Sequence, residues 1–184
     1  KKGREYLSAE YDSTDYSKIK KPEFVPGLEI PYNGRYLTVP QYGIKTFSDL
    51  FTSRQLTALT TFRDLILNYR EKIIDDALKA GFDNDDTRLD DGGKGATAYA
   101  DAIITYIAFI FDRCVHSWSS FSFFVPTYAR QALAMVWDFA EANPFSNSTG
   151  NWSAAIIWIT NAMRKFPVSG NSIVDQVDAT KSLF

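Results

Sequence analysis

The sequence has 184 residues, of which 45% are apolar and 23% are charged; this balance is typical of one folded domain and excludes a disordered chain. Twenty lysine and arginine residues stand against 22 aspartate and glutamate residues, and the net charge of −2 argues against a free-standing, non-specific nucleic-acid binder. The single cysteine and the single histidine, Cys114 and His116, exclude a disulfide scaffold and a Cys/His zinc cluster.

The sequence predicts no membrane partner. The longest uncharged apolar stretch in a helical pattern, residues 102–111, is half of the roughly 20 residues that a bilayer needs. Because the first residues also lack the apolar core of a signal peptide, and because one lone thiol fits a reducing compartment, we expect a cytoplasmic protein. The chain begins at Lys1 rather than at an initiator methionine, and we therefore expect it to be a piece of a longer protein.

The first 42 residues predict an arm followed by a small hairpin. Residues 1–27 are polar and charged and contain Pro22 and Pro26, which is typical of an arm or connector. Within 28–42, the dipeptide Asn33-Gly34 separates two short runs of alternating polarity. Because Asn-Gly tolerates positive φ at both turn positions, it predicts a β-hairpin here.

Four helices are predicted after the hairpin. The first begins at a capping box formed by Thr52 and Gln55, carries an apolar stripe and ends before Gly81. The other three are predicted at about 96–117, 128–142 and 152–166, and a strand is predicted at 172–177. We therefore expect a mainly α fold: a helical bundle of about four main helices over 28–167, with the hairpin at 28–42, and a C-terminal strand within 168–184.

Three motifs that could carry chemistry have simpler interpretations. The glycine-rich stretch at 92–96 opens a helix whose amides could hold an anion, but its spacing fits no known phosphate loop, and a flexible loop is favoured. The acidic run in 82–95 lacks the spacing of a calcium loop, and a solvated loop is favoured. Cys114 and His116 are two positions apart on a helix, face different sides and cannot form a nucleophile pair.

The segment 135–152 combines side-chain amides with aromatic rings. The amides can pair with base edges, and the rings can stack on bases. These residues are Asn143, Asn147 and Asn151, and Trp137, Phe145 and Trp152. The alternative is a helix end followed by a capped helix, with the aromatic side chains in the core; composition alone favours this alternative.

Four stretches of the sequence resemble, in the same order, the large adenine-specific DNA methylases of bacteria and archaea that carry an N-terminal domain of unknown function. They lie within 36–184, and the residues before them and the segment 117–127 match less well. The four are 42–66 (YGIKTFSDLFTSRQLTALTTFRDLI), 91–103 (DGGKGATAYADAI), 130–152 (RQALAMVWDFAEANPFSNSTGNW) and 175–180 (DQVDAT).

The resemblance implies an S-adenosylmethionine-dependent DNA adenine methyltransferase with a doubly wound α/β catalytic domain. Its glycine-rich cofactor loop is expected upstream of this chain, and its Asp-Pro-Pro-Tyr catalytic motif is expected downstream. Neither motif is present, and Asn143-Pro144-Phe145 lacks the second proline. The chain thus resembles the insert between the two motifs: the C-terminal strand is expected to belong to the catalytic sheet, and the chain alone is expected to be catalytically silent.

The same resemblance implies a contact with the cofactor. Asp178 and Ala179 follow the predicted strand, and ligands of open α/β sheets bind at the carboxyl ends of strands. Asp178 could there accept a hydrogen bond from the adenine amino group of S-adenosylmethionine; a surface aspartate at a strand end is an equally good interpretation. The cofactor is expected in the whole enzyme and is not expected to bind this chain well.

An insert of this kind is expected to take part in DNA recognition, through phosphate contacts for register and groove contacts for sequence. The candidate contacts are Arg54, Gln55, Arg88, Lys94, Arg130, Asn147 and Asn151. Two other functions stay open. One is a protein-interaction or assembly module of a DNA modification or phage-defence complex, with partner proteins in place of DNA. The other is a helical domain that binds a small ligand in an aromatic pocket.

Overall fold

The longest element of the computed structural model is helix α1 (Ser53–Lys79), and side chains close in the sequence define its start. Thr52 Oγ1 accepts a hydrogen bond of 3.2 Å from the backbone N–H of Gln55, and Gln55 Oε1 accepts one of 2.7 Å from the N–H of Thr52. After Lys79, Gly81 adopts a φ of 92°, which lets the chain leave the helix. The predicted first helix and its capping box are confirmed.

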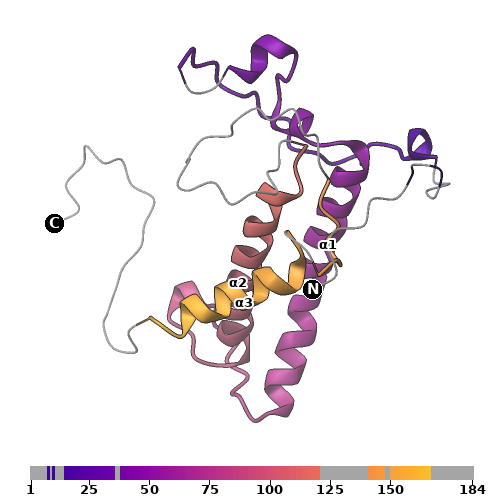
Figure 1. Cartoon of the computed structure of the whole chain (residues 1–184). Coiled ribbons are helices and arrows are strands. Elements are labelled where there is room, and N and C mark those ends of the chain that lie inside the picture. The colour runs from indigo at the N-terminus through magenta and orange to yellow at the C-terminus, as the bar shows by residue number, and fades with distance from the viewer. Residues whose placement is uncertain are drawn as a thin grey trace, which may run out of the picture.

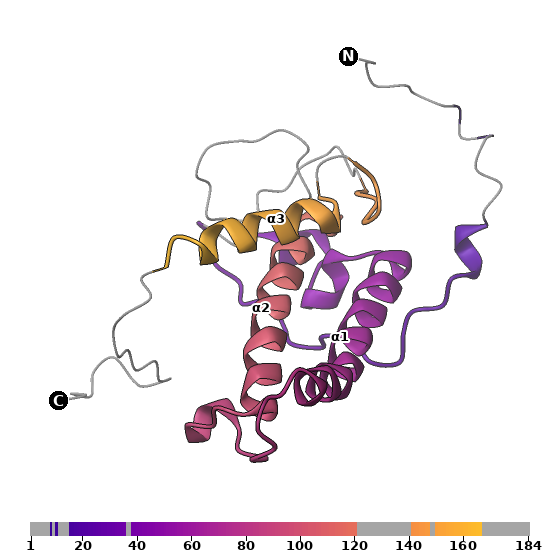
Figure 2. The same ribbon diagram turned by 90° about the horizontal axis from the view of Figure 1, so that it is seen from below.

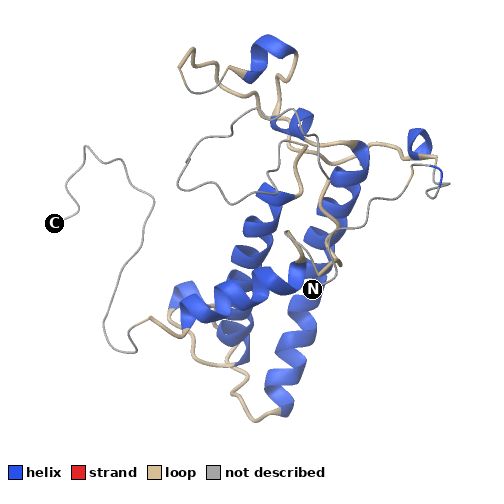
Figure 3. Cartoon of the chain, in the orientation of Figure 1, coloured by secondary structure: helices blue, strands red, loops and turns tan. Residues whose placement is uncertain are grey.

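The structure describes residues 8, 10, 15–35, 38–120, 141–147 and 150–166, which are drawn in colour in Figure 1. This part of the chain is mainly helical: α1, α2 (Ala96–Ser117) and α3 (Trp152–Met163) are joined by loops and short 3-10 helices, and it contains no strand (Figure 3). The predicted helices at 96–117 and 152–166 are confirmed, although α3 ends three residues early. None of the helices in these ranges is long and apolar enough to cross a membrane.

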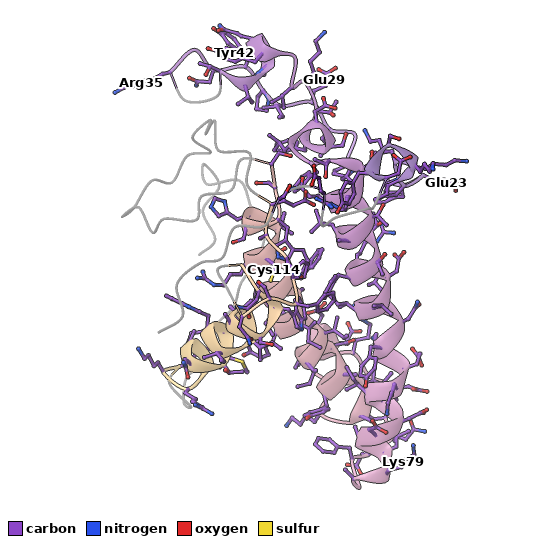
Figure 4. All side chains as sticks on the ribbon, turned by 45° about the vertical axis from the view of Figure 1, so that its right-hand side comes forward. Glu23, Glu29, Arg35, Tyr42, Lys79 and Cys114 are labelled. Atoms are coloured by element: carbon purple, nitrogen blue, oxygen red, sulfur yellow. The ribbon has the colours of Figure 1, made fainter. Side chains whose placement is uncertain are left out.

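Helices α1 and α2 lie side by side and run in opposite directions, joined at one end by the loop 80–95 (Figure 1 and Figure 2). Figure 4 shows Lys79 at this end of the pair, and Cys114 further along α2, beside α3. An ion pair holds the two helices together: Arg70 Nε and Nη2 donate hydrogen bonds of 2.9 and 2.7 Å to Asp101 Oδ1.

The main core lies where α3 crosses the second half of α2. Trp118, directly after α2, is 2% exposed, and Cys114 is buried beside it. Burial raises the pKa of the Cys114 thiol to about 11, which keeps the thiol protonated and unreactive at neutral pH. The buried residues of this core are Leu59, Ile110, Cys114, Trp118, Ala142 and Ala155.

The β-hairpin predicted at 28–42 is not shown by the described residues, and residues 36 and 37 of its second run lie outside them. Glu29 instead forms an isolated antiparallel bridge with Thr46. Val39–Tyr42 is a 3-10 helix rather than the end of a second strand, because Pro40 has no N–H to donate to a ladder and its fixed φ suits a helical turn. The buried side chains that hold this region together are Ile30, Val39 and Leu50.

Several predictions fall outside the described residues. They include the helix at 128–142, apart from positions 141 and 142, which are not helical, and the strand at 172–177. Most of the first 14 residues of the predicted arm also fall outside. The site candidates that lie there are Arg130, Asp178 and Ala179.

Candidate functional site

A cavity of about 460 Å³ opens between the first half of α1, Trp118 and residues 141–145. Its volume lies within the range of ordinary small-molecule sites, about 300–1,000 Å³. The apolar side chains at its wall include Phe62, Pro144 and Phe145. Because residues 141–145 are far from α1 in the sequence, the cavity exists only once the chain has folded. We call it the Phe145 cavity.

Phe62 is the centre of an aromatic cluster at this cavity. Its ring centroid lies 4.9 Å from that of Trp118 and 4.9 Å from that of Trp152, and both pairs are tilted. The ring of Phe145 lies 6.0 Å from Phe62 and is nearly parallel to it, with an interplanar angle of 28°. Because Trp118 is fully buried whereas Phe145 is 81% exposed, the cluster runs from the core to the surface.

An ion pair between distant segments closes the rim of the cavity. Arg54 Nε donates a hydrogen bond of 2.8 Å to Glu141 Oε1, and Arg54 Nη2 donates a second one to the other carboxylate oxygen. The guanidinium also lies 3.8 Å from the centre of the Tyr16 ring, in the arm before α1. This bidentate pairing fixes the orientation of Arg54 and neutralises its charge within the chain.

Gln55 lies next to this pair and has a structural task. Its Oε1 accepts the hydrogen bond from the Thr52 N–H that caps α1, and it also accepts one of 3.0 Å from Ser120 Oγ. The side chain is buried and contributes to the wall of the Phe145 cavity. Gln55 thus links the start of α1 to the chain that leaves α2.

Residues 143–146 form a turn that presents Phe145. Asn143 Oδ1 accepts a hydrogen bond of 2.9 Å from the Phe145 N–H, which is the pattern of an Asx turn. The backbone carbonyl of Asn143 accepts a further one of 3.1 Å from the Ser146 N–H. The turn is joined to α3, because the Trp152 N–H donates a hydrogen bond of 2.8 Å to the Pro144 carbonyl.

At the N-terminal end of α2, the carboxylate of Asp85 accepts hydrogen bonds from the glycine-rich motif and takes the place of a bound anion. Asp85 Oδ2 accepts a hydrogen bond of 3.2 Å from the Gly95 N–H, and Oδ1 accepts one of 3.2 Å from the Thr87 N–H. These amides, Thr87 above all, hold the pKa of the Asp85 carboxyl below its usual value. A Cβ on Gly95 would lie 2.4 Å from the Asp83 carbonyl oxygen, so this close approach needs glycine.

The described candidates for DNA contact fall into two groups and do not form one surface. Arg88 and Lys94 lie before the start of α2, whereas Arg54 and Phe145, two residues before Asn147, line the cavity near its end. A helix of 22 residues spans about 33 Å, which separates the two groups. Within the described ranges, no cluster of three or more His, Cys, Asp or Glu side chains could hold a metal ion.

The individual surroundings of these candidates also differ. Arg54 is paired with Glu141, and Arg88 Nε lies 3.7 Å from an Asp101 oxygen. Asn151 caps α3, since its Oδ1 accepts a hydrogen bond of 2.7 Å from the Ala154 N–H. The side chains that remain exposed are those of Arg88, Lys94 and Asn147.

Among the residues of the cavity wall that sequence reasoning missed are Phe62, Trp118 and Glu141. From the sequence, Phe62 was interpreted as one of several residues in the apolar stripe of α1, and no role was predicted for Trp118 or Glu141. No local signal distinguishes them, because each acquires its role from a partner in a distant segment. In the aromatic segment, Trp152 packs against the core, as the alternative interpretation predicts. Phe145 is exposed, and its stacking on bases stays a prediction, while Trp137 lies outside the described residues.

The described residues define a mainly helical protein with an aromatic cavity near the end of its second helix. No protein-family model, curated protein or solved structure matches the chain. The methylase family therefore stays a prediction from the resemblance of the four stretches.

Proposed function

We propose that this chain is the insert of an S-adenosylmethionine-dependent, adenine-specific DNA methyltransferase, and that it helps to recognise the target DNA or supports the catalytic site. The observation that carries the proposal is that separate stretches of the resemblance meet in space. The first and third stretches supply the two partners of the Arg54–Glu141 ion pair and of the Phe62–Phe145 ring pair. Stretches that resemble one family and together build one cavity are expected to share one task.

The charges of the described residues favour contact with bases over a clamp on phosphates. The guanidinium of Arg54 is held by Glu141, and that of Arg70 is held by Asp101. Neutralisation of phosphates needs cations that face the DNA. We therefore expect most phosphate contacts on other parts of the longer enzyme, in agreement with the net charge of −2 of this chain.

The reaction of such an enzyme explains what an insert would contribute. Methylation of the adenine amino group requires the base to leave the stack, at a cost of a few kcal/mol. Protein groups that hold displaced bases and fix the register offset this cost. S-adenosylmethionine would supply the methyl group in the longer enzyme; Asp178 and Ala179, which the resemblance assigns to it, lie outside the described residues.

A methyl-transfer assay on two proteins tests the proposal. The longer protein that contains this chain is incubated with duplex DNA and S-adenosylmethionine carrying a tritiated methyl group, and the 184-residue chain is assayed in parallel. We expect labelled adenine with the longer protein and no transfer with the chain alone. A duplex with 2-aminopurine in place of adenine lacks the 6-amino group and is the control substrate. Transfer by the chain alone, or no adenine methylation by the longer protein, contradicts the proposal.

A second function, as a protein-interaction or assembly module of a DNA modification or phage-defence complex, is favoured by the surface of α3. Ile157, Trp158 and the following Phe166 are 59%, 62% and 57% exposed. Large apolar side chains exposed together are typical of a contact surface for another protein or domain. In this case Trp158→Ser weakens assembly of the complex and leaves methylation of naked DNA unchanged. Salt-dependent DNA binding by the chain itself counts against this alternative.

A further inference from the structure

The geometry points to the Phe145 cavity as a site for one unstacked nucleobase that carries carbonyl acceptors. In the proposed enzyme this base is a neighbour of the target adenine, or its pairing partner, rather than the target itself. That the base comes from DNA rests on the proposed function. The kind of base that the cavity binds is inferred separately, from the residues of the cavity wall.

Two nearly parallel rings at the cavity come close to the spacing that a planar guest needs. Phe62 and Phe145 lie 6.0 Å apart and are nearly parallel. A ring held between two others needs about 3.5 Å to each of them, or about 7 Å in all. Because Phe145 is exposed and belongs to a turn, a shift of about 1 Å opens this slot while the core around Trp118 stays in place.

The rim of the cavity favours a neutral guest. Arg54 is the only cation among the described wall residues, and it is engaged by Glu141 through two hydrogen bonds. A phosphate that entered the cavity would lose its hydration shell and would find no unpaired cation to compensate for this loss. A neutral base gives up less solvation and gains contact with the aromatic walls.

The side-chain amides of the wall can offer hydrogen-bond donors, while its carboxylate, that of Glu141, is engaged by Arg54. Gln55 Oε1 is already used by Thr52 and Ser120, and Asn143 Oδ1 is used by Phe145. The side-chain nitrogens of Gln55 and Asn143 have no hydrogen-bond partner among the described residues. An amide N–H pairs with the carbonyl oxygens of thymine or with O6 and N7 of guanine. Adenine can accept at its ring nitrogens, but its amino group also needs an acceptor, and the amide oxygens of Gln55 and Asn143 are already used. We therefore expect adenine to bind this wall less tightly than a base with carbonyl oxygens.

Binding of single-stranded oligonucleotides to the chain tests this assignment. The probes are a fluorescein-labelled oligothymidylate, an oligoadenylate and a strand of abasic sites, all of one length, and fluorescence anisotropy gives Kd. Since stacking of one base is worth a factor of about five to a hundred in affinity, we expect the oligothymidylate to bind roughly tenfold tighter than the abasic strand. We also expect the oligoadenylate to bind more weakly than the oligothymidylate.

Two substitutions, each with a matched control, localise the site. Phe145→Ala removes one stacking face and should raise Kd for oligothymidylate about fivefold or more, whereas Phe166→Ala, at another exposed phenylalanine, should leave Kd unchanged. Asn143→Asp keeps the oxygen that accepts from the Phe145 N–H but removes the side-chain N–H donors, and it should weaken binding. Asn147→Asp makes the same change of charge outside the cavity wall and should have the smaller effect.

The outcomes separate this inference from the proposed function. No binding of oligothymidylate, an equal Kd for the abasic strand, or no effect of Phe145→Ala overturns the base site, while methyl transfer still decides the function. A longer protein that does not methylate adenine overturns the function, whereas base-dependent binding by the chain would stand. Tighter binding of oligoadenylate contradicts the assignment of donors. Circular dichroism melting checks each variant, and Phe145→Ala should melt like the wild type because its ring is exposed.

Discussion

The indole N–H of Trp118 donates a hydrogen bond of 2.7 Å to the backbone carbonyl of Gly150, 32 residues further along the chain. Trp118 directly follows α2, and Gly150 directly precedes Asn151, the N-cap of α3. The bond therefore ties the end of one helix to the start of the next, beside the Phe145 cavity. Since Trp118 is buried, the bond is shielded from water, and its loss leaves a carbonyl without its partner.

We expect Trp118→Phe to lower the free energy of unfolding by about 1–3 kcal/mol, because an aromatic ring is kept but the Gly150 carbonyl loses its donor. Urea unfolding followed by circular dichroism measures this change. Trp158→Phe is the control, since Trp158 is largely exposed, and it should shift stability by less than about 0.5 kcal/mol. Equal stabilities of the two variants would show that the bond contributes nothing.

Gly150→Ala should also destabilise the fold, for a reason of backbone geometry. Gly150 has a φ of +83°, and an added Cβ would lie 2.9 Å from Ser117 Cβ and 3.0 Å from Ala142 Cβ. The left-handed conformation alone costs an alanine about 1–2 kcal/mol. The control is Gly27→Ala, where an added Cβ meets nothing within 4 Å. A thermal melt should show a lower Tm for Gly150→Ala and an unchanged one for Gly27→Ala; the reverse order would contradict the geometry.

The ion pair between Arg70 and Asp101 makes stability depend on pH. Burial alone would raise the pKa of Asp101, but hydrogen bonds from Arg70 and from the Leu89 N–H outweigh it, and the pKa is lowered. The carboxylate therefore stabilises the fold above its unfolded pKa of about 3.9, and this contribution is lost as the pH falls through the folded pKa. Asp101→Asn should cost about 1.5–3 kcal/mol at neutral pH and flatten the loss of stability in acid.

Asp64→Asn is the matched control for this prediction. Asp64 pairs with its sequence neighbour Arg63 on the surface of α1, and exposed pairs of this kind contribute about 0–1 kcal/mol. Urea unfolding at neutral and acid pH compares the two variants with the wild type. If Asp101→Asn keeps the acid sensitivity of the wild type, another carboxylate is responsible.

Asp85 should stabilise the start of α2 in a similarly pH-dependent way. Its pKa is lowered mainly by the Thr87 N–H, so the contribution is present above the unfolded pKa and is lost as the pH falls through the folded value. Asp85→Asn should lower Tm at neutral pH and speed amide hydrogen exchange in the first turn of α2. Asp86→Asn, with the same change of charge one residue away, should leave this exchange unchanged; equal effects of both would mean that overall charge is responsible.

Helix starts could be predicted from the sequence because their hydrogen bonds are local. The caps at Thr52 and Asn151 each join groups three residues apart, so a pattern of a few residues contains the whole interaction. The predicted hairpin is not shown by the described residues, and the contact that does form in this region is not local. Its alternating pattern was local, but the bridge that forms joins Glu29 to Thr46, and the segment around Pro40, Val39–Tyr42, is a 3-10 helix.

By itself, the sequence determined that the chain is mainly helical and where the described helices begin, because apolar spacing and caps act within a few residues. Which aromatic rings are buried was decided by the tertiary structure. The ring of Phe62 contacts the rings of Trp118 and Trp152 in the core, whereas the ring of Phe145 is exposed at the surface. The cavity depends on the meeting of Arg54 and Glu141, 87 residues apart. No local pattern encodes such a contact, because its free energy is gained only after the intervening chain has folded and closed that loop.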